Sequence, residues 1–444
     1  MTADNKYEYV SEMIKFIDAS PTCFHAVSNI EKMLTGFEKL DEKSLWNIEA
    51  GKSYYVIRKD SSIIAFRVPK NKYSSIRITS SHSDSPSFKI KPEAIMETEG
   101  HYLRVNTEKY GGMIISSFLD RPLSIAGRVV VKEGNGLKNK LFNIDRNLLM
   151  IPSVAIHMNR EVNDGYKYNA QVDTIPLLGM MDSDGKGNKN YKDSLRKIIA
   201  ESAGVAAQDI MGEDLFLYIR EPGTVWGMNN EFVSSRALDD LQCAYGTTKG
   251  FVESLSEINE DSDNILSVCC IFDNEEVGSL TAQGADSTFL KDTLYRINEA
   301  LTFDESTLLM AIANGYMVSA DNAHAVHPNH PEYADPTNRP YLNEGIVIKY
   351  NASQKYTTDA ESEAMFKMVC SEANVKTQTF TNRSNMAGGS TLGNISNRHI
   401  SIRTVDIGLP QLSMHSAYET SGVMDLEYLI KAMKVFYLLP LQVV

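Results

Sequence analysis

Five short patches of histidine, aspartate and glutamate follow apolar stretches of this chain. They contain His82, Asp239, the pair Glu275 and Glu276, Asp321 and His415. Imidazole and carboxylate groups are the ligands that hold zinc in many hydrolytic enzymes. A site with two metal ions needs a carboxylate shared between them, further ligands of these types, and an open position for water. The five patches therefore predict a two-metal hydrolase site.

Strand-like runs precede four of these patches. The runs are Ile76 to Ile78, Ile265 to Phe272, Leu308 to Val318 and Ile402 to Leu409. In open α/β sheets, binding sites collect in the crevice beyond the carboxyl ends of the strands. Patches that are far apart in the sequence can therefore converge at one edge of a sheet.

The two adjacent glutamates can divide the work of such a site. Neighbouring side chains point in different directions, so one of Glu275 and Glu276 can bind metal while the other reaches the attacking water as a general base. Asp84, two residues after His82, is placed to orient the imidazole and to fix which nitrogen faces the metal. Each patch alone is also typical of a solvated loop, because charged residues are mostly exposed. The conjunction of all five favours the metal site.

Two further motifs are weaker. Gly388 and Gly389 lack the spacing of a phosphate-binding loop and indicate a tight turn or a close approach of substrate to the backbone. Three histidines spaced by three residues could suggest a metal-binding helix face, but two prolines interrupt them, which favours a loop. These histidines are His324, His327 and His330.

The composition favours a soluble enzyme. The 444 residues contain 44 Lys and Arg against 57 Asp and Glu, and the net charge of -13 argues against a nucleic-acid partner and an anionic membrane surface. No apolar run reaches membrane-spanning length, and the first thirty residues lack the pattern of a signal peptide. The five cysteines are an odd number without CxxC spacing, which is typical of a reducing compartment. We therefore expect a cytoplasmic protein with no membrane association.

The chain also reads as two modules. Helix-like and strand-like segments alternate at both ends, beginning with a helix from Tyr7 to Ile17, whereas the middle indicates β-strands and a solvated loop. The predicted strands lie at Ile114 and Ile115, Ile125 to Val131 and Leu215 to Ile219, and the loop at Met180 to Asp193. Because His82 precedes this middle segment and the other candidate ligands follow it, the segment is best taken as an insertion.

This organisation gives a specific expectation for the fold. We expect a three-layer α/β/α catalytic domain with a central mixed sheet, formed by residues 1–91 and 229–444. A smaller β-rich inserted domain, residues 92–228, would interrupt it.

Long motifs in this sequence resemble the aspartyl aminopeptidase family of dinuclear zinc metallopeptidases. The resemblance spans nearly the whole chain. The motifs are Ser20-Pro21-Thr22 with Phe24-His25-Ala26-Val27, Ser81-His82-Ser83-Asp84-Ser85-Pro86, Leu119-Asp120-Arg121-Pro122-Leu123, Ala155-Ile156-His157-Met158-Asn159-Arg160, Leu238-Asp239-Asp240-Leu241, Asp273-Asn274-Glu275-Glu276-Val277-Gly278-Ser279, Ser319-Ala320-Asp321-Asn322-Ala323-His324 and Pro410-Gln411-Leu412-Ser413-Met414-His415-Ser416.

The resemblance implies roles for the site residues. It implies two divalent metal ions per subunit, Zn²⁺ with Co²⁺ or Mn²⁺ as alternatives, and Glu275 as the general base. Asp239 would bridge the two ions, although the family has Leu-Asp-Asn where this chain has Leu238-Asp239-Asp240, so both aspartates come into question. The implied ligands are His82, Asp239, Glu276, Asp321 and His415.

The resemblance also implies substrates and assembly. The family's inserted domain mediates dimerisation, and a histidine in it, matched by His157, reaches the active site of the neighbouring subunit. Lys349 matches the lysine that meets an acidic first residue of the substrate. Gly389 is a candidate substrate contact on its residue type alone, as one of the two glycines at which the backbone could approach substrate closely. Family members form closed homo-oligomers, often dodecamers built from dimers. The match at Lys349 implies a preference for peptides that begin with Asp or Glu.

Two alternatives stay open. The same scaffold could serve an aminopeptidase for neutral N-terminal residues, because the family's aromatic residues after Gly111-Gly112 are replaced here by Met113-Ile114-Ile115. A non-catalytic assembly or cargo shell could use the fold as well. Such a shell would have no chemical need for Glu275, and its presence beside every implied ligand favours the enzyme.

Overall fold

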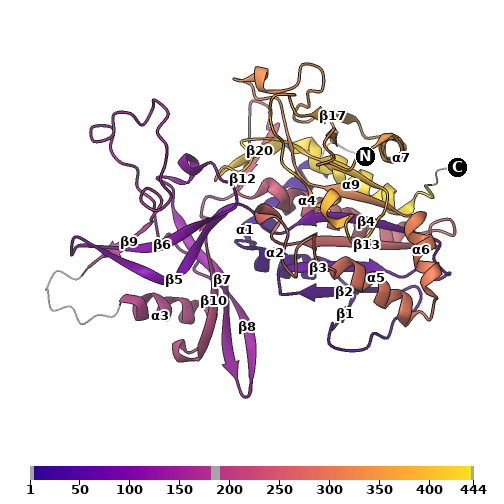
Figure 1. Ribbon diagram of the computed structural model, residues 1–444, viewed down its shortest axis with the longest axis horizontal. Helices are drawn as coiled ribbons and strands as arrows, with labels where there is room; N and C mark the ends of the chain where they lie inside the picture. Colours follow the sequence, from indigo (N-terminus) through magenta and orange to yellow (C-terminus); the bar gives the residue numbers. More distant parts are fainter. Residues whose placement is uncertain (1–4, 182–190, 442–444) are drawn as a thin grey trace. The chain divides into compact units, whose positions relative to one another are not determined.

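The computed structural model describes residues 5–181 and 191–441, and the chain divides into two compact units (Figure 1). Unit 1 contains Met1–Asp84, Gly223–Met414 and Glu419–Val444, and unit 2 contains Ser85–Pro222 and His415–Tyr418. Most of the predicted loop at Met180 to Asp193 lies outside the described residues. Its last residues, from Tyr191 on, begin a helix instead.

A nine-stranded mixed sheet forms the centre of unit 1. Strands β13, β4, β14 and β18 run parallel to one another, whereas β3 and β16 pair with this group in the antiparallel sense. The predicted α/β class with a central mixed sheet is thereby confirmed. The strand order is β1 (Glu38–Leu40), β2 (Ser53–Arg58), β3 (Ser62–Arg67), β13 (Ile265–Phe272), β4 (Ser75–His82), β14 (Tyr316–Ala320), β18 (Thr404–Gly408), β16 (Ile346–Tyr350) and β17 (Thr377–Thr381).

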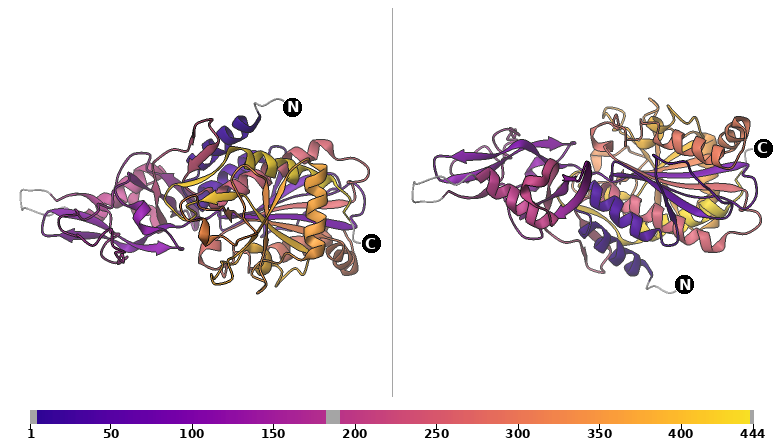
Figure 2. Two further views of the ribbon diagram at one scale, coloured as in Figure 1. Left: turned by 90° about the horizontal axis from the view of Figure 1, so that it is seen from above. Right: turned by 90° about the horizontal axis from the view of Figure 1, so that it is seen from below.

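Helices cover both faces of this sheet, as two views from opposite sides show (Figure 2). The strands are apolar on both faces, so successive side chains enter different cores: in β13, Cys269 and Ile271 join one core, and Cys270 and Phe272 join the other. The first core is closed by α1 (Asn5–Asp18), α2 (Cys23–Met33), α4 (Leu238–Ser254), α7 (Ala360–Glu372) and α9 (Val423–Leu438). The second is closed by α5 (Phe289–Ala300), α6 (Glu305–Ala313) and α8 (Leu392–Ser396).

The prediction of a strand over the apolar run Leu308 to Val318 is wrong. It forms most of α6 and the first part of β14. Asp304 caps α6, because its side chain accepts a hydrogen bond from the backbone N–H of Thr307 at 2.8 Å. A run this apolar has no periodicity that separates a buried helix from a buried strand. The predicted helix from Tyr7 to Ile17, by contrast, is confirmed as α1.

Unit 1 also contains a smaller five-stranded sheet. Its order is β11 (Thr224–Trp226), β12 (Phe232–Ser235), β20 (Glu419–Gly422), β19 (Pro410–Leu412) and β15 (Ala323–His324). β19 leaves the end of β18 after Leu409, and β15 follows β14 after two residues. The small sheet therefore takes up the chain directly beyond the carboxyl ends of two central strands.

Unit 2 is built on a six-stranded antiparallel sheet with its own apolar core. Its order is β8 (Gly136–Asn143), β7 (Leu123–Glu133), β10 (Ile210–Ile219), β5 (Ser87–Thr98), β6 (Tyr102–Tyr110) and β9 (Leu177–Met180), and α3 (Tyr191–Ala203) packs on it. Two of the predicted strands lie inside β7 and β10. The third prediction is wrong, because Ile115 begins a short 3-10 helix that ends at Phe118. That two-residue run was too short to define a period.

Among the described residues, no helix combines the length and the apolar character needed to cross a membrane. All five cysteines are buried and none is in a disulfide.

Candidate metal centre

The candidate metal centre lies at the carboxyl ends of parallel strands in unit 1. His82 is the last residue of β4 and stands beside Phe272, the last residue of β13, and Asp321 follows directly after β14. Glu275 and Glu276 lie in the turn after β13, and Asp239 lies at the start of α4. Strand ends that align at one sheet edge thus bring together patches separated by up to 239 positions in sequence, from His82 to Asp321.

His82 is the centre of two overlapping groups of possible ligands. Its Nε2 atom lies 3.5 Å from Asp239 Oδ1 and 3.9 Å from Asp321 Oδ1. One donor atom from each of His82, Asp239, Asp240 and Asp321 lies within 4.8 Å of the others, and the same holds for His82, Glu275 and Glu276. The aspartates and the histidine are buried, and the two glutamates are half-buried. This donor set of one imidazole and several carboxylates fits a zinc-type cation.

Asp84 connects the imidazole to the glutamate turn. His82 Nδ1 lies 3.0 Å from the backbone oxygen of Asp84 and 3.3 Å from its Oδ1. The same carboxylate accepts hydrogen bonds from the backbone N–H groups of Glu275 and Glu276, both at 3.2 Å. One buried side chain can therefore fix the imidazole and the position of both glutamates.

Asp240 also belongs to this group of acids. The sequence had left open whether Asp239 or Asp240 is the ligand. Its Oδ2 atom accepts a hydrogen bond of 3.0 Å from the backbone N–H of His82, and it is fully buried. Asp239 and Asp240 both depart from helical φ and ψ angles within α4. The Asp239 N–H donates to Glu419 at 2.9 Å, which ties this irregular turn to β20. Both carboxylates can therefore belong to one group although they are adjacent in sequence.

The buried carboxylates around His82 need positive charge to balance them. Burial, together with repulsion from neighbouring carboxylates, raises the pKa of Glu275 to about 8 and the pKa values of Glu276 and Asp240 well above their usual range. Burial alone would lower the pKa of His82, but the charge of Asp240 and contacts with Asp239, Asp321 and Asp84 raise it well above its usual value. Without a cation, protons must supply the missing positive charge. Divalent ions would replace those protons, and these residues fit such ions.

Lys349 brings a fixed positive charge to the same group. Its Nζ atom lies 3.3 Å from Asp321 Oδ2 and donates to the backbone oxygen of Asn322 at 2.9 Å. The side chain is only 2% exposed, and Nζ also lies 5.5 Å from the centre of the Tyr356 ring. The ammonium group is therefore engaged with a candidate metal ligand rather than open to solvent.

Three further predicted site residues are not members of the two groups around His82. His415 belongs to unit 2, where its Nδ1 lies 2.6 Å from the backbone oxygen of Gly112 and its backbone oxygen accepts from the Ile114 N–H at 2.9 Å. A proton on Nδ1 would leave the Nε2 lone pair for a metal. His157 is exposed in a turn of unit 2, and Gly389 is exposed in a loop of unit 1, where an added Cβ would meet nothing within 4 Å. Their roles stay predictions.

Sequence reasoning missed two further buried acids near this edge. Asp273 directly follows β13, and burial together with the charge of Asp84 raises its pKa to about 7. Asp406 lies within β18 and is fully buried. The available signal was the same in both cases: a lone acid inside or just after an apolar run, where charged residues are rarely tolerated without partners.

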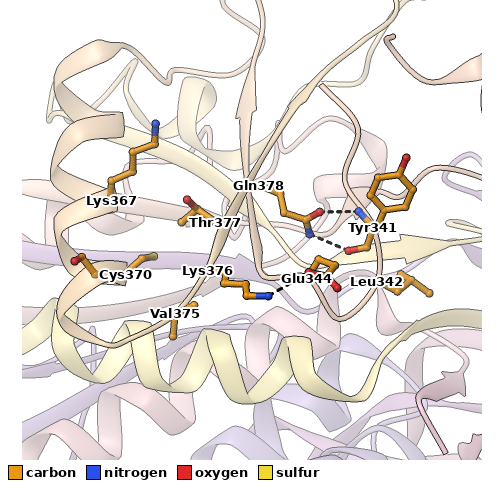
Figure 3. A pocket seen from close by; sticks show the side chains of 10 residues that line it. Tyr341, Leu342, Glu344, Lys367, Cys370, Val375, Lys376, Thr377 and Gln378 are labelled. Carbon is orange, nitrogen blue, oxygen red and sulfur yellow. Dashed lines mark hydrogen bonds and ion pairs between the residues drawn. The ribbon is translucent and has the colours of Figure 1, made fainter. Parts of the chain in front are cut away.

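A separate hollow of unit 1 lacks the chemistry of the metal centre. It is an open hollow with a volume of about 990 Å³ beside the edge strand β17 and helix α7 (Figure 3). Its two lysines are paired with glutamates, Lys376 with Glu344 at 3.4 Å and Lys367 with Glu363. The Gln378 amide makes two hydrogen bonds of 2.8 Å with the Tyr341 backbone, which closes one wall (Figure 3). None of its lining residues belongs to the candidate ligand set.

Comparison with known proteins gives a consistent result. Residues 16–437 match the family described as aminopeptidase I zinc metalloprotease (M18). A protein named probable M18 family aminopeptidase 2 from Clostridium novyi is 47% identical over 98% of this chain and 99% of its own length.

Solved structures agree with these sequence matches. A chain in a cryo-EM structure of the Ape4 and Nbr1 complex is 36% identical, with a TM-score of 0.93 over 98% of this chain and 86% of that one. A chain of the mApe1 dodecamer of S. cerevesiae is 28% identical, with a TM-score of 0.83 over 96% of this chain and 95% of that one.

The raised pKa values predict how metal removal affects stability. When folding raises a group's pKa, the folded state holds a proton that the unfolded state has released, and stability is lost as the pH rises through the folded pKa. Glu275 and His82 shift in this same direction. We expect the melting temperature of protein freed of metal by a chelator to fall as the pH rises through about 8. The rise in melting temperature caused by added zinc should become larger over the same range of pH.

The matched control for this experiment is chelated Glu275→Gln, which lacks one of the titrating groups and should show a shallower dependence on pH. Differential scanning fluorimetry on both proteins, with and without zinc, measures the effect. A chelated wild type that becomes more stable relative to the zinc form as the pH rises would contradict this electrostatic account.

Proposed function

Because this chain belongs to the aminopeptidase I (M18) family of zinc metalloproteases, and is thus a metal-dependent aminopeptidase, we propose specific roles for the residues around His82. The family resemblance inferred from the sequence motifs is confirmed. The observation that supports the proposed roles is the convergence of one imidazole and several raised-pKa carboxylates at one sheet edge.

We assign the metal ligands to the five residues that the sequence motifs imply, and the geometry within unit 1 supports four of them. His82, Asp239, Glu276 and Asp321 come from unit 1, with Asp239 as the shared carboxylate, and His415 comes from unit 2. When bound, a pair of divalent ions, most simply Zn²⁺, activates water and polarises the scissile carbonyl. Asp84 orients His82 through its contact with Nδ1.

Glu275 is proposed as the general base. It stands beside the ligand Glu276, with its backbone N–H held by Asp84 at 3.2 Å. Its half-buried position allows it to take a proton from the attacking water and to return that proton to the leaving amine. The neighbouring cation that would lower its pKa again would also keep it in the basic form.

Substrate preference is proposed from Lys349. A lysine in an otherwise acidic chain is the local cation that would select an N-terminal Asp or Glu. The ion pair between Lys349 and Asp321 supports a second candidate, an aminopeptidase for neutral residues, because this cation already has an acidic partner. The two candidates differ in whether a substrate carboxylate can compete for the ammonium group.

Assembly is proposed from unit 2. Homo-oligomerisation through this unit would let His157, exposed in its turn, complete the active site of a neighbouring subunit. The similarity to a chain of the mApe1 dodecamer supports a homo-oligomer, and we propose that dimers are its building blocks. The exposed apolar side chains of Val154, Ile156 and Met158 beside His157 are the kind of surface that such a contact would bury.

The first prediction concerns the base. Glu275→Gln should keep its metal and lose about 100-fold or more of its turnover, because general-base catalysis contributes about that much. Metal analysis and rates with aminoacyl substrates check this. His82→Ala is the contrasting variant and should lose bound metal. Full turnover of Glu275→Gln at full metal loading would remove Glu275 from its role.

The second prediction concerns specificity. Lys349→Leu should weaken kcat/KM for an aspartyl substrate by about 2 kcal/mol or more and leave a leucyl substrate unchanged or better, if Lys349 contacts the substrate acid. Lys376→Leu, which removes an exposed lysine paired with Glu344, is the matched control. Equal losses on both substrates would assign Lys349 to holding Asp321, and a wild-type preference for leucine would favour the neutral aminopeptidase.

The third prediction concerns assembly. His157→Ala should lower activity without loss of metal, and mixing it with Glu275→Gln should regenerate part of the activity in hybrid particles. In a mixed pair of subunits, one of the two active sites would combine an intact Glu275 from one subunit with an intact His157 from the other, whereas the second site would carry both defects. Activity after mixing, followed together with particle size, checks this. A dilute monomer with full activity would rule out the shared site.

A further inference from the structure

Asp406 is a buried carboxylate with no place in the ligand set or in the proton transfer described above. It lies in the middle of β18, is fully buried, and by strand alternation points to the face covered by α5, α6 and α8. Burying a carboxylate is costly unless its oxygens are satisfied. The hydrogen-bond partners of Asp406 therefore indicate the role of its side chain.

One side of Asp406 holds the segment that follows β16. Its Oδ2 atom accepts hydrogen bonds from the backbone N–H of Thr357 at 2.5 Å and from the Thr357 hydroxyl at 2.7 Å. The backbone N–H of Asp406 donates to the Thr358 hydroxyl at 3.0 Å. Residues 355–358, which we call the threonine segment, are thus fixed to the central sheet by a side chain and by backbone.

The other side of Asp406 holds the loop that follows β17. Its Oδ1 atom accepts a hydrogen bond of 2.7 Å from the hydroxyl of Thr391, which is 2% exposed. A Cβ added at Gly393 would lie 2.7 Å from the same oxygen, so the start of α8 packs directly against the carboxylate. Residues 382–391, which we call the glycine loop, contain Gly388 and Gly389 and end at this contact.

A separate bond joins the two segments to each other. Lys355 Nζ, in the threonine segment, donates to the backbone oxygen of Gly388 in the glycine loop at 2.7 Å. Between Gly388 and the anchor at Thr391 the loop is exposed, and Gly389 faces open space. The loop is therefore held at two points with an exposed glycine between them.

The threonine segment also reaches the metal centre. Tyr356, next to Thr357, places its ring 5.5 Å from the Nζ atom of Lys349, and the same Nζ lies 3.3 Å from Asp321. Asp321 and Asp406 both act electrostatically on Lys349. A continuous line of contacts thus runs from a candidate metal ligand through Lys349 and Tyr356 to Asp406.

We propose that Asp406 is a positioning residue for substrate binding, which holds the threonine segment and the glycine loop together as one wall of the peptide site. This inference rests on the proposed aminopeptidase function. Asp406 does not touch the reacting atoms; it acts through Thr357 and Thr391. Hydrogen bonds to a buried charge are stronger than those between neutral groups, so this anchor is stiffer than a neutral side chain would make it.

A matched pair of variants at Thr391 tests the proposal. Thr391→Val keeps the shape of the side chain but removes the hydroxyl that reaches Asp406, whereas Thr391→Ser keeps the hydroxyl. We expect Thr391→Val to raise KM for aminoacyl substrates by about 5- to 10-fold with kcat and metal content nearly unchanged, the pattern of lost substrate binding. Thr391→Ser should stay close to the wild type.

Limited proteolysis gives a readout that does not depend on activity. Trypsin should cut after Arg383, in the glycine loop, several-fold faster in Thr391→Val than in Thr391→Ser, because the loop has lost one anchor. Thr357→Val and Thr357→Ser repeat the comparison on the threonine segment. They also serve if Asp406→Asn, the direct variant, does not fold.

The outcomes separate the inference from the function on which it rests. A wild type that hydrolyses no aminoacyl substrate would overturn the proposed function, and this inference with it. An active wild type whose Thr391→Val and Thr391→Ser variants share the same KM would overturn the positioning role alone. A fall in kcat or in metal content with KM unchanged would do the same, because the defect would then lie in the metal centre.

Discussion

The organisation of unit 1 depends on one electrostatic constraint, which is the gathering of several carboxylates at one sheet edge around a single imidazole. Like charges at these separations repel strongly in a low-dielectric environment, and the raised pKa values of Glu275, Glu276 and Asp240 record that repulsion. Such a group is tolerated only if cations or protons balance it. The surrounding structure must therefore hold the acids in place against their mutual repulsion until a cation binds.

The frame that does this is apolar on both sides. The central strands send alternate apolar side chains into two separate cores, and the candidate ligands His82 and Asp321 lie at or just beyond the ends of these strands. The first turn of α4 contains Asp239 and Asp240, and the helix then packs along α9, where a Cβ at Gly250 would lie 2.6 Å from the Met433 Cβ. This close packing fixes the helix whose first turn supplies two acids. Asp84 adds a polar brace by holding His82 and the glutamate turn at once.

The sequence predicted the parts of this arrangement that depend on residue type and on strand ends. His82, Asp321 and the glutamate pair each follow an apolar run, and parallel strands bring such positions together whatever their separation along the chain. The run Leu308 to Val318 was misread because its apolar residues fit a helix and a strand equally, and only the cap at Asp304 separates the two.

Contacts between distant segments could not be predicted. The ion pair of Lys349 with Asp321, and the hold of Asp406 on Thr357 and Thr391, depend on which strands are neighbours in the sheet. No local pattern records that order. The lone acid inside the apolar strand β18 was the one visible sign that a partner had to exist.

The charges along this face of the sheet also bear on specificity. Asp321, Lys349 and Asp406 place a positive charge among negative ones, and burial raises the importance of each contact. A substrate carboxylate that approached Lys349 would have to share the ammonium group with Asp321. A metal ion bound to Asp321 would offset the negative charge of this carboxylate. Lys349 would then attract a substrate carboxylate more strongly, because Asp321 would balance less of its positive charge. Selectivity for an acidic first residue would then be coupled to metal loading, because one carboxylate serves both partners.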